Sequence, residues 1–277
     1  MFSPRKRVAH SQLTHRRRAV ALRYLFLFVM FGIVLVVGVS YVLGRDEITI
    51  SNVLSGGNEV VTDKALSALV QSELEGKYLH LFPKASIFFY PKKQLEASVL
   101  NAFKRVKTAS ISFTDFQSIS IDIKERSPYA LWCGENETLE EVKNECYFLD
   151  ERGFVYATAP HFSGNTFFRY YGILEDASLP IGAHFLVPDM FREITFFIQT
   201  LKSITPLPVS LAVVSDTNME ITLVDTSRLL VRRDTNLTRT LENIQSFFDS
   251  KEYQDRGDKE LDYVDFRYGN KVYFTFE

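Results

Sequence analysis

The feature that most constrains this chain is a run of twenty uncharged, mostly apolar residues near its beginning, Tyr24 to Leu43. At about 1.5 Å per residue, a helix of that length covers the roughly 30 Å hydrocarbon core of a bilayer. A cleaved signal peptide has a shorter apolar region and a small-x-small cleavage site, which the stretch 39–44 lacks. A buried core helix is seldom apolar on every side for about five turns. The run therefore predicts a single transmembrane helix at 24–43.

The charges on the two sides of this run predict its direction. Seven basic residues and no acidic residue lie in the tail 1–23, and the first carboxylates, Asp46 and Glu47, follow the run. Because Lys and Arg stay on the cytoplasmic side, we expect the tail inside and everything after Gly44 outside. The outer part holds the other 25 of the 32 basic residues and all 34 acidic ones, a net charge of −9. An acidic surface of this kind argues against nucleic-acid binding.

The only two cysteines, Cys133 and Cys146, both lie in the predicted outer part. Two thiols in an oxidising compartment are most simply a disulfide. Each cysteine lies within or beside an apolar, strand-like run, and the polar stretch 134–145 separates them. This indicates a hairpin with a long acidic loop, closed at its base. A metal site would need two further ligands, and the nearest histidine, His161, has no suitable spacing, so we expect no metal.

The region 47–126 predicts an α+β domain with the element order β-α-α-β-β. Thr62 and Asp63 are typical of a helix start, and apolar residues at helical spacing follow through Leu74. Pro91 suits the start of a second helix. The stretch 119–123 alternates isoleucine with polar residues, as a half-buried strand does. The predicted elements are a strand near 48–53, helices at 63–74 and 92–103, and strands at 110–113 and 119–123.

The region 127–277 predicts a mostly antiparallel β domain with two helices. Apolar residues at helical spacing indicate helices at about 189–204 and 237–248. The chain ends in two strands joined by Gly269 and Asn270, a pair that suits a two-residue hairpin turn. The predicted strands are 129–133, 146–149, 154–157, 166–171, 209–214, 219–224, 229–232, 263–268 and 271–276.

Four features of the chain, taken in order, match the pattern of one known family. The first is the predicted membrane helix followed at once by the β-α-α-β-β region, which looks like a POTRA domain. The stretch 121–132 is similar to a strand ending in Glu-Arg-x-Pro-x-Ala-x-Trp, 148–155 to a hairpin with Asp-x-x-Gly, and 264–268 to a C-terminal Asp-Leu-Arg-Tyr. In their order and spacing these features resemble the FtsQ/DivIB family of bacterial cell-division proteins. Phe266 replaces the family's Leu and keeps an apolar side chain, and the cysteine pair is not a general family feature.

The residues in these stretches also have purely structural interpretations. Glu125 and Arg126 suit a solvated strand end. Asp150 suits a turn that it orients through its own side chain. Gly153 suits a positive φ, which other residues disfavour.

The resemblance implies a single-pass scaffold of the divisome in the bacterial cytoplasmic membrane at the division septum. It implies that FtsB/DivIC-like and FtsL-like coiled-coil proteins bind the C-terminal β region, and that other septal proteins bind the POTRA-like domain. A terminal hairpin can leave an edge strand whose backbone groups pair with a partner's strand. We expect Arg267 opposite Val272, and Phe266 opposite Tyr273. The partner-binding residues that the resemblance implies are Arg267, Tyr268, Val272, Tyr273, Phe274 and Phe276.

No catalytic sequence motif is present, and the histidines of the outer part, His80, His161 and His184, lie far apart. We therefore expect no enzyme activity, no cofactor and no small-molecule substrate. Two alternatives remain. A POTRA-bearing export or assembly component would have tandem POTRA units or a downstream barrel. An exported hydrolase would have a deep pocket with perturbed titratable groups.

Overall fold

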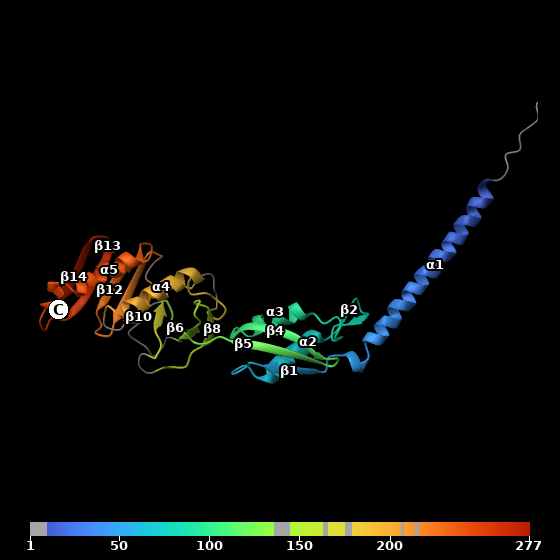
Figure 1. The fold of residues 1–277 in the computed structure, drawn as a ribbon, viewed down its shortest axis with the longest axis horizontal. Coiled ribbons are helices and arrows are strands. Elements are labelled where there is room, and N and C mark those ends of the chain that lie inside the picture. Colours follow the sequence, from blue (N-terminus) through green and yellow to red (C-terminus); the bar gives the residue numbers. More distant parts are fainter. Residues whose placement is uncertain (1–9, 136–144, 163–165, 175–178, 206–207, 214–215) are drawn as a thin grey trace, which may run out of the picture. The chain divides into compact units, whose positions relative to one another are not determined.

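A computed structural model describes residues 10–135, 145–162, 166–174, 179–205, 208–213 and 216–277 (Figure 1). The chain divides into two compact units. The first unit comprises Met1–Ala102 and Thr108–Lys124, and the second comprises Phe103–Lys107 and Glu125–Glu277. Both units mix helices with strands, which confirms the predicted α+β class at this level.

The first unit begins with α1 (His10–Leu43), a helix of 34 residues. Its part Val20–Leu43 is long and apolar enough to cross a membrane, and it contains the whole predicted segment 24–43. The large apolar side chains of this part are mostly exposed, so α1 is not a core helix. It is the one helix of this kind among the described residues.

The rest of the first unit contains a three-stranded sheet with the order β1-β5-β4, in which β1 runs parallel to β5. The Thr62 side chain caps α2 by accepting a hydrogen bond from the Ala65 N–H, as the sequence predicts. A small hairpin, β2–β3, lies between the two helices and was not predicted. The elements are η1 (Asp46–Ile48), β1 (Asn52–Gly56), α2 (Asp63–Leu74), β2 (Lys77–Tyr78), β3 (Phe82–Pro83), α3 (Lys92–Ala102), β4 (Val106–Asp115) and β5 (Ser118–Glu125).

The second unit is built on a nine-stranded sheet with the order β14-β13-β12-β11-β10-β9-β6-β7-β8. Most neighbouring pairs are antiparallel, but β12–β13, β9–β10 and β6–β9 are parallel. The strands are β6 (Ala130–Trp132), β7 (Tyr147–Leu149), β8 (Val155–Thr158), β9 (Arg169–Tyr171), β10 (Pro208–Val213), β11 (Asn218–Leu223), β12 (Arg228–Arg232), β13 (Leu261–Tyr268) and β14 (Lys271–Phe276).

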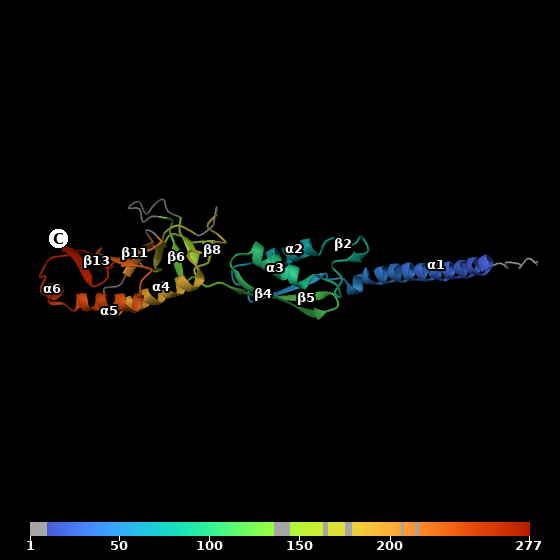
Figure 2. The ribbon, with the colours of Figure 1, turned by 90° about the horizontal axis from the view of Figure 1, so that it is seen from above.

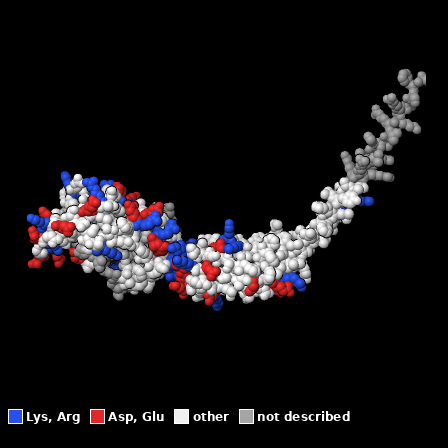
Figure 3. Space-filling view, viewed as in Figure 1, with Lys and Arg blue, Asp and Glu red and all other residues white. Residues whose placement is uncertain are grey.

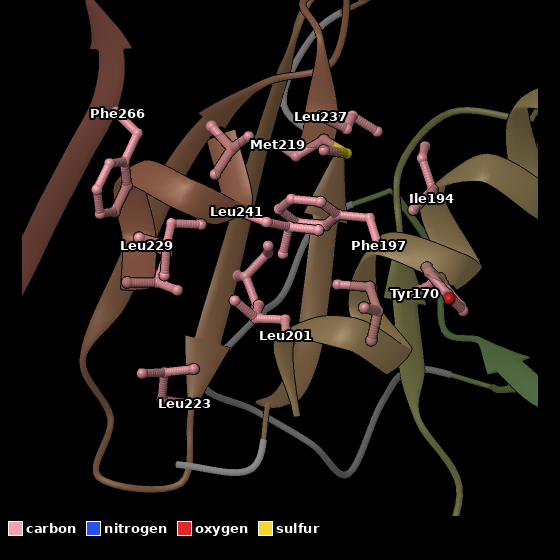
Figure 4. Packing of buried hydrophobic residues seen from close by; sticks show 14 of the residues in the cluster. Tyr170, Ile194, Phe197, Leu201, Met219, Leu223, Leu229, Leu237, Leu241 and Phe266 are labelled. Atoms are coloured by element: carbon pink, nitrogen blue, oxygen red, sulfur yellow. The ribbon is translucent and has the colours of Figure 1, made fainter. Parts of the chain in front are cut away.

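Two amphipathic helices, α4 (Pro188–Leu201) and α5 (Leu237–Phe248), lie along one side of this sheet (Figure 2). Their apolar faces meet the strands in one core, where Phe197 and Leu201 of α4 lie near Leu241 of α5 and Leu229 of β12 (Figure 4). A short helix, α6 (Lys251–Gln254), follows α5 and was not predicted. The two predicted helices thus cover the sheet because each presents a continuous apolar stripe.

The predicted disulfide is present between Cys133 and Cys146, next to the paired strands β6 and β7. The acidic loop that the sequence predicts between them lies mostly outside the described residues. On the side of the sheet near the disulfide, Leu131, Cys133 and Tyr171 form a small second core with Phe148 and its neighbours.

The predicted turn at Asp150 is confirmed, but the solvated strand end at Arg126 is wrong. The Asp150 carboxylate is buried and accepts hydrogen bonds from the backbone N–H groups of Arg152 and Phe154 at 2.8 and 3.0 Å. It also forms an ion pair with Arg126, whose guanidinium lies 4.2 Å from the centre of the Phe154 ring. A buried carboxylate needs a partner of opposite charge, and Arg126 supplies it.

Candidate functional site: the C-terminal sheet edge

The last strand of the chain, β14, lies at one end of the nine-stranded sheet and pairs only with β13. In the part of the chain that the structure describes, no strand lies beyond it. The opposite end of the sheet differs, because the segment 182–185 pairs with the first residue of β8. There the Val155 N–H donates to the Ala183 carbonyl at 2.9 Å, and the Gly182 N–H donates to the Val155 carbonyl at 2.8 Å. We call the outer side of Lys271–Phe276 the β14 edge.

The hairpin turn at Gly269 and Asn270 is confirmed. Tyr268 pairs with Lys271 across it, and Gly269 has a φ of +68°. Two side chains of α5 hold this turn: Arg239 donates to the Asn270 side-chain oxygen at 3.0 Å, and Asn243 donates to the Gly269 carbonyl at 3.3 Å. The turn is therefore tied to the helix that covers the sheet.

The predicted pairing of Phe266 with Tyr273 is wrong. Asp265, not Phe266, lies opposite Tyr273, because a β-bulge occurs between Asp265 and Tyr268. Phe266 and Arg267 together oppose the single residue Val272. A bulge of this kind adds one residue to one strand and increases its local twist. It keeps Phe266 in the core, where its ring lies 6.2 Å from that of Phe247.

An ion pair within β13 stabilises the bulge. The Arg267 guanidinium donates to both oxygens of the nearly buried Asp265 carboxylate, at 2.9 and 2.6 Å, and the Arg267 N–H donates to it at 3.0 Å. Burial favours the neutral form of Asp265, but the hydrogen bonds and charge of Arg267 outweigh it and lower the pKa of this carboxyl. Arg267 is thus engaged within the protein.

The two faces of β14 differ in what they contact. Val272 and Phe276 pack against the main core, and the ring of Phe274 lies 5.2 Å from that of Phe247 on α5. On the other face, Tyr273 makes an edge-on contact with Tyr268 at 5.3 Å between ring centres. Both tyrosines are exposed, and Phe274 is 38% exposed. An added strand would therefore meet apolar side chains on the helix-covered face and tyrosines on the other.

The pairing at the chain end indicates which backbone groups face outward. Glu277 and Glu260 exchange both hydrogen bonds, with N···O distances of 2.9 and 3.2 Å. In an antiparallel pair, residues that exchange both bonds alternate with residues that exchange none. Glu277 therefore faces β13 with its backbone groups, and so do the odd-numbered residues of β14. The N–H and C=O groups of Val272, Phe274 and Phe276 point away from β13, toward the β14 edge.

The structure groups the six predicted partner-binding residues in one hairpin but gives them different surroundings. Tyr268 and Tyr273 lie together on the exposed face, and Val272, Phe274 and Phe276 lie on the helix-covered face. Arg267 forms the ion pair of the bulge instead of lying free at the surface. The sequence analysis did not single out Asp265. An acidic residue between apolar residues and two positions before an arginine, however, indicates an ion pair within one strand.

Among the described residues, no group of three or more His, Cys, Asp or Glu side chains is placed to hold a metal ion. A comparison of the sequence with protein-family models finds no match, and a comparison with curated proteins finds no similar protein.

Proposed function

We propose that this protein is a single-pass membrane scaffold of the bacterial divisome that binds a partner by strand addition at the β14 edge. The observation that carries the proposal is the position of β14 at the end of the sheet with no strand beyond it among the described residues. An unpaired edge offers backbone donors and acceptors to another chain, and natural proteins usually block such edges. At the opposite end of the same sheet, the segment 182–185 blocks the edge in this way at Val155.

In this proposal the partner adds a tenth strand to the sheet. The N–H and C=O groups of Val272, Phe274 and Phe276 give the affinity, because backbone hydrogen bonds replace bonds to water at an already ordered strand. Phe274 and Tyr273, which are both exposed, flank the new strand on its two faces and give selectivity. Arg267 positions the edge through the bulge rather than touching the partner.

The resemblance to the FtsQ/DivIB family supports the rest of the proposal. It names the partners as FtsB/DivIC-like and FtsL-like proteins, and it makes the β1–α2–α3–β4–β5 region a POTRA-like domain that binds other septal proteins. The helix Val20–Leu43 is long and apolar enough to hold the protein in the membrane. We place the basic tail in the cytoplasm and the second unit outside, with no enzyme activity.

The test compares two substitutions at one position of the edge. Val272→Pro removes the outward N–H without removing a bond to β13, and proline is tolerated on an edge strand in this orientation. Val272→Thr keeps the N–H and the β-branched shape. We expect Val272→Pro to weaken capture of the FtsB/DivIC-like partner from membranes by about tenfold or more, since a lost hydrogen bond and a steric clash together cost about 1.4 kcal/mol or more.

Val272→Thr should capture the partner nearly as well as the unchanged protein. Because Val272 packs against the core, both variants should be somewhat less stable than the unchanged protein, but both should still unfold in one complete transition. The fluorescence of the single tryptophan, Trp132, in the second unit follows this transition. Unchanged capture by a folded Val272→Pro protein would exclude strand addition at the β14 edge. Equal loss in both variants would assign binding to the valine side chain instead of the backbone.

A further inference from the structure

Five of the large apolar side chains that the first unit exposes belong to its β2–β3 loop, its β4–β5 hairpin and the loop after β3. Leu79 is 84% exposed and Phe88 61% exposed, and Phe113 and Phe116 are more than half exposed. The rings of Phe88 and Phe113 lie 6.4 and 6.0 Å from that of Phe116, so they form one aromatic group. With Leu81, which lies near Leu79 in the loop between β2 and β3, we call these five residues the apolar rim.

Two hydrogen bonds place the apolar rim beside the end of α1. The Ser40 hydroxyl donates to the Leu81 carbonyl at 2.5 Å, and the Gln117 side-chain amide donates to the Asp46 carbonyl at 3.0 Å. Ser40 lies within the span Val20–Leu43, about 4.5 Å along the helix from its end. The rim therefore lies at the depth where the apolar span ends. Figure 3 shows that much of the visible face of the first unit carries neither basic nor acidic side chains, although Arg45, Asp46 and Glu47 just after α1 are exposed.

The backbone around Leu79 is costly within the protein alone. Leu79 and His80 have φ angles of +48° and +61°, a left-handed conformation that costs about 1 kcal/mol or more for each such residue. This conformation accompanies a leucine that is almost fully exposed. Contact with lipid would offset both costs, because apolar side chains at the boundary between head groups and acyl chains leave water.

We propose that the apolar rim inserts into the interfacial layer of the bilayer and docks the first unit on the membrane surface. This rests on the proposed function in one respect, that α1 spans the membrane. Phe and Leu suit this layer, and Lys77, at the base of the β2–β3 hairpin, is exposed and can reach lipid phosphates. The first unit is then held by lipid at two places besides α1, the β2–β3 loop and the β4–β5 turn.

The test uses the full-length protein in vesicles of phosphatidylethanolamine and phosphatidylglycerol that carry a nitroxide near the top of the acyl chains. Three variants each add one tryptophan: Leu79→Trp, Phe116→Trp and, as the matched control, Val60→Trp. Val60 is 60% exposed and follows β1 in the chain. The first residue of β1, Asn52, lies beside Gln117, and its last residue, Gly56, lies about 13 Å further along the strand, away from the apolar rim. The buried Trp132 is the same background in all three proteins.

We expect the nitroxide to quench the added tryptophans at 79 and 116 at least about three times as strongly as the one at 60, because only they reach the acyl chains. Equal quenching at all three positions would overturn the proposal. A second result would also overturn it: tryptophans at 79 and 116 that neither the lipid nitroxide nor aqueous iodide quenches, with a protection that increases with the protein-to-lipid ratio. In that case a second copy of the protein, rather than lipid, would cover the apolar rim. Extraction of the protein from the vesicles by alkaline carbonate would instead contradict the membrane span. Failure of partner capture by the β14 edge is a separate result, because it is measured with the Val272 variants.

Discussion

Gly153 lies where two separate constraints exclude a side chain. Its φ is +74°, and a Cβ atom at this position would lie 2.8 Å from the nearest ring atom of Phe191 on α4. The glycine therefore allows the β7–β8 turn, held by the Asp150 carboxylate, to pack directly against a core aromatic ring. The sequence predicts the positive φ, but only the tertiary structure brings Phe191 to this turn.

We predict that Gly153→Ala destabilises the second unit by about 2–4 kcal/mol, because it adds overpacking to backbone strain. Gly257→Ala is the matched control, since Gly257 has a similar φ of +66° and no atom within 4 Å of its added Cβ. The control should cost only about 1 kcal/mol, the strain alone. Denaturant unfolding followed by Trp132 fluorescence measures both, and equal costs would show that the Phe191 contact is relieved without penalty.

A second residue-level prediction concerns Asp265 and pH. The pKa of this carboxyl is below its ordinary value of 3.8, so its ion pair with Arg267 contributes stability above that pH. This contribution is lost as the pH falls through the lowered pKa. The stability difference between the unchanged protein and Asp265→Asn should therefore be largest near neutral pH and shrink below about pH 4. Urea unfolding at several pH values measures it.

Asp262→Asn is the control for this pH series, since Asp262 lies on the same strand and pairs with Arg228 at 2.9 Å, but is more exposed. A stability difference for Asp265→Asn that does not change between neutral and acidic pH would show that the carboxylate charge contributes nothing. The same shift in both variants would show that the pH dependence is not specific to the bulge.

Among the elements, β6 and β7 are short strands of three residues each, and the disulfide Cys133–Cys146 closes the loop between them. Short strands with a long connection lose much conformational entropy when they pair. The disulfide reduces this loss by constraining the unfolded chain. The spacing of two cysteines at strand ends made this pairing predictable, whereas the parallel neighbour of β6, the strand β9, was not.

We predict that replacing both cysteines by alanine lowers the free energy of unfolding of the second unit by about 3 kcal/mol, as expected for a closed loop of this length. Adding a thiol reductant to the unchanged protein should produce the same loss, which controls for the lost side-chain contacts of the sulfur atoms. A reductant that leaves the unfolding curve unchanged would show that the strands pair equally well without the covalent link.

The whole molecule contains two units with separate cores. The first unit buries residues such as Leu66, Leu95 and Ile121, and the second is organised around α4, α5 and the nine-stranded sheet. Since the only tryptophan, Trp132, lies in the second unit, its fluorescence reports that unit alone. Far-ultraviolet circular dichroism reports both units.

We predict that Leu95→Ala, a substitution in the core of the first unit, lowers the denaturant midpoint of part of the circular dichroism change while leaving the Trp132 curve unchanged. Truncating a fully buried leucine costs about 2–5 kcal/mol in the unit that contains it. The matched substitution Leu229→Ala in the second core should shift the Trp132 curve instead. Equal shifts of both signals in either variant would show that the two units unfold as one.

Local patterns in the sequence were sufficient for the apolar span, the amphipathic helices, the alternating strands and the turn at Gly269, because each depends on neighbouring residues and their backbone preferences. These local patterns did not predict the order of the nine strands, the parallel pairs of the sheet, the bulge at Arg267 or the ion pair of Arg126 with Asp150. An edge strand and a central strand have the same alternation of residues. Only the packing of distant segments decided that β14 lies at one end of the sheet and that the segment 182–185 pairs with Val155 at the other end.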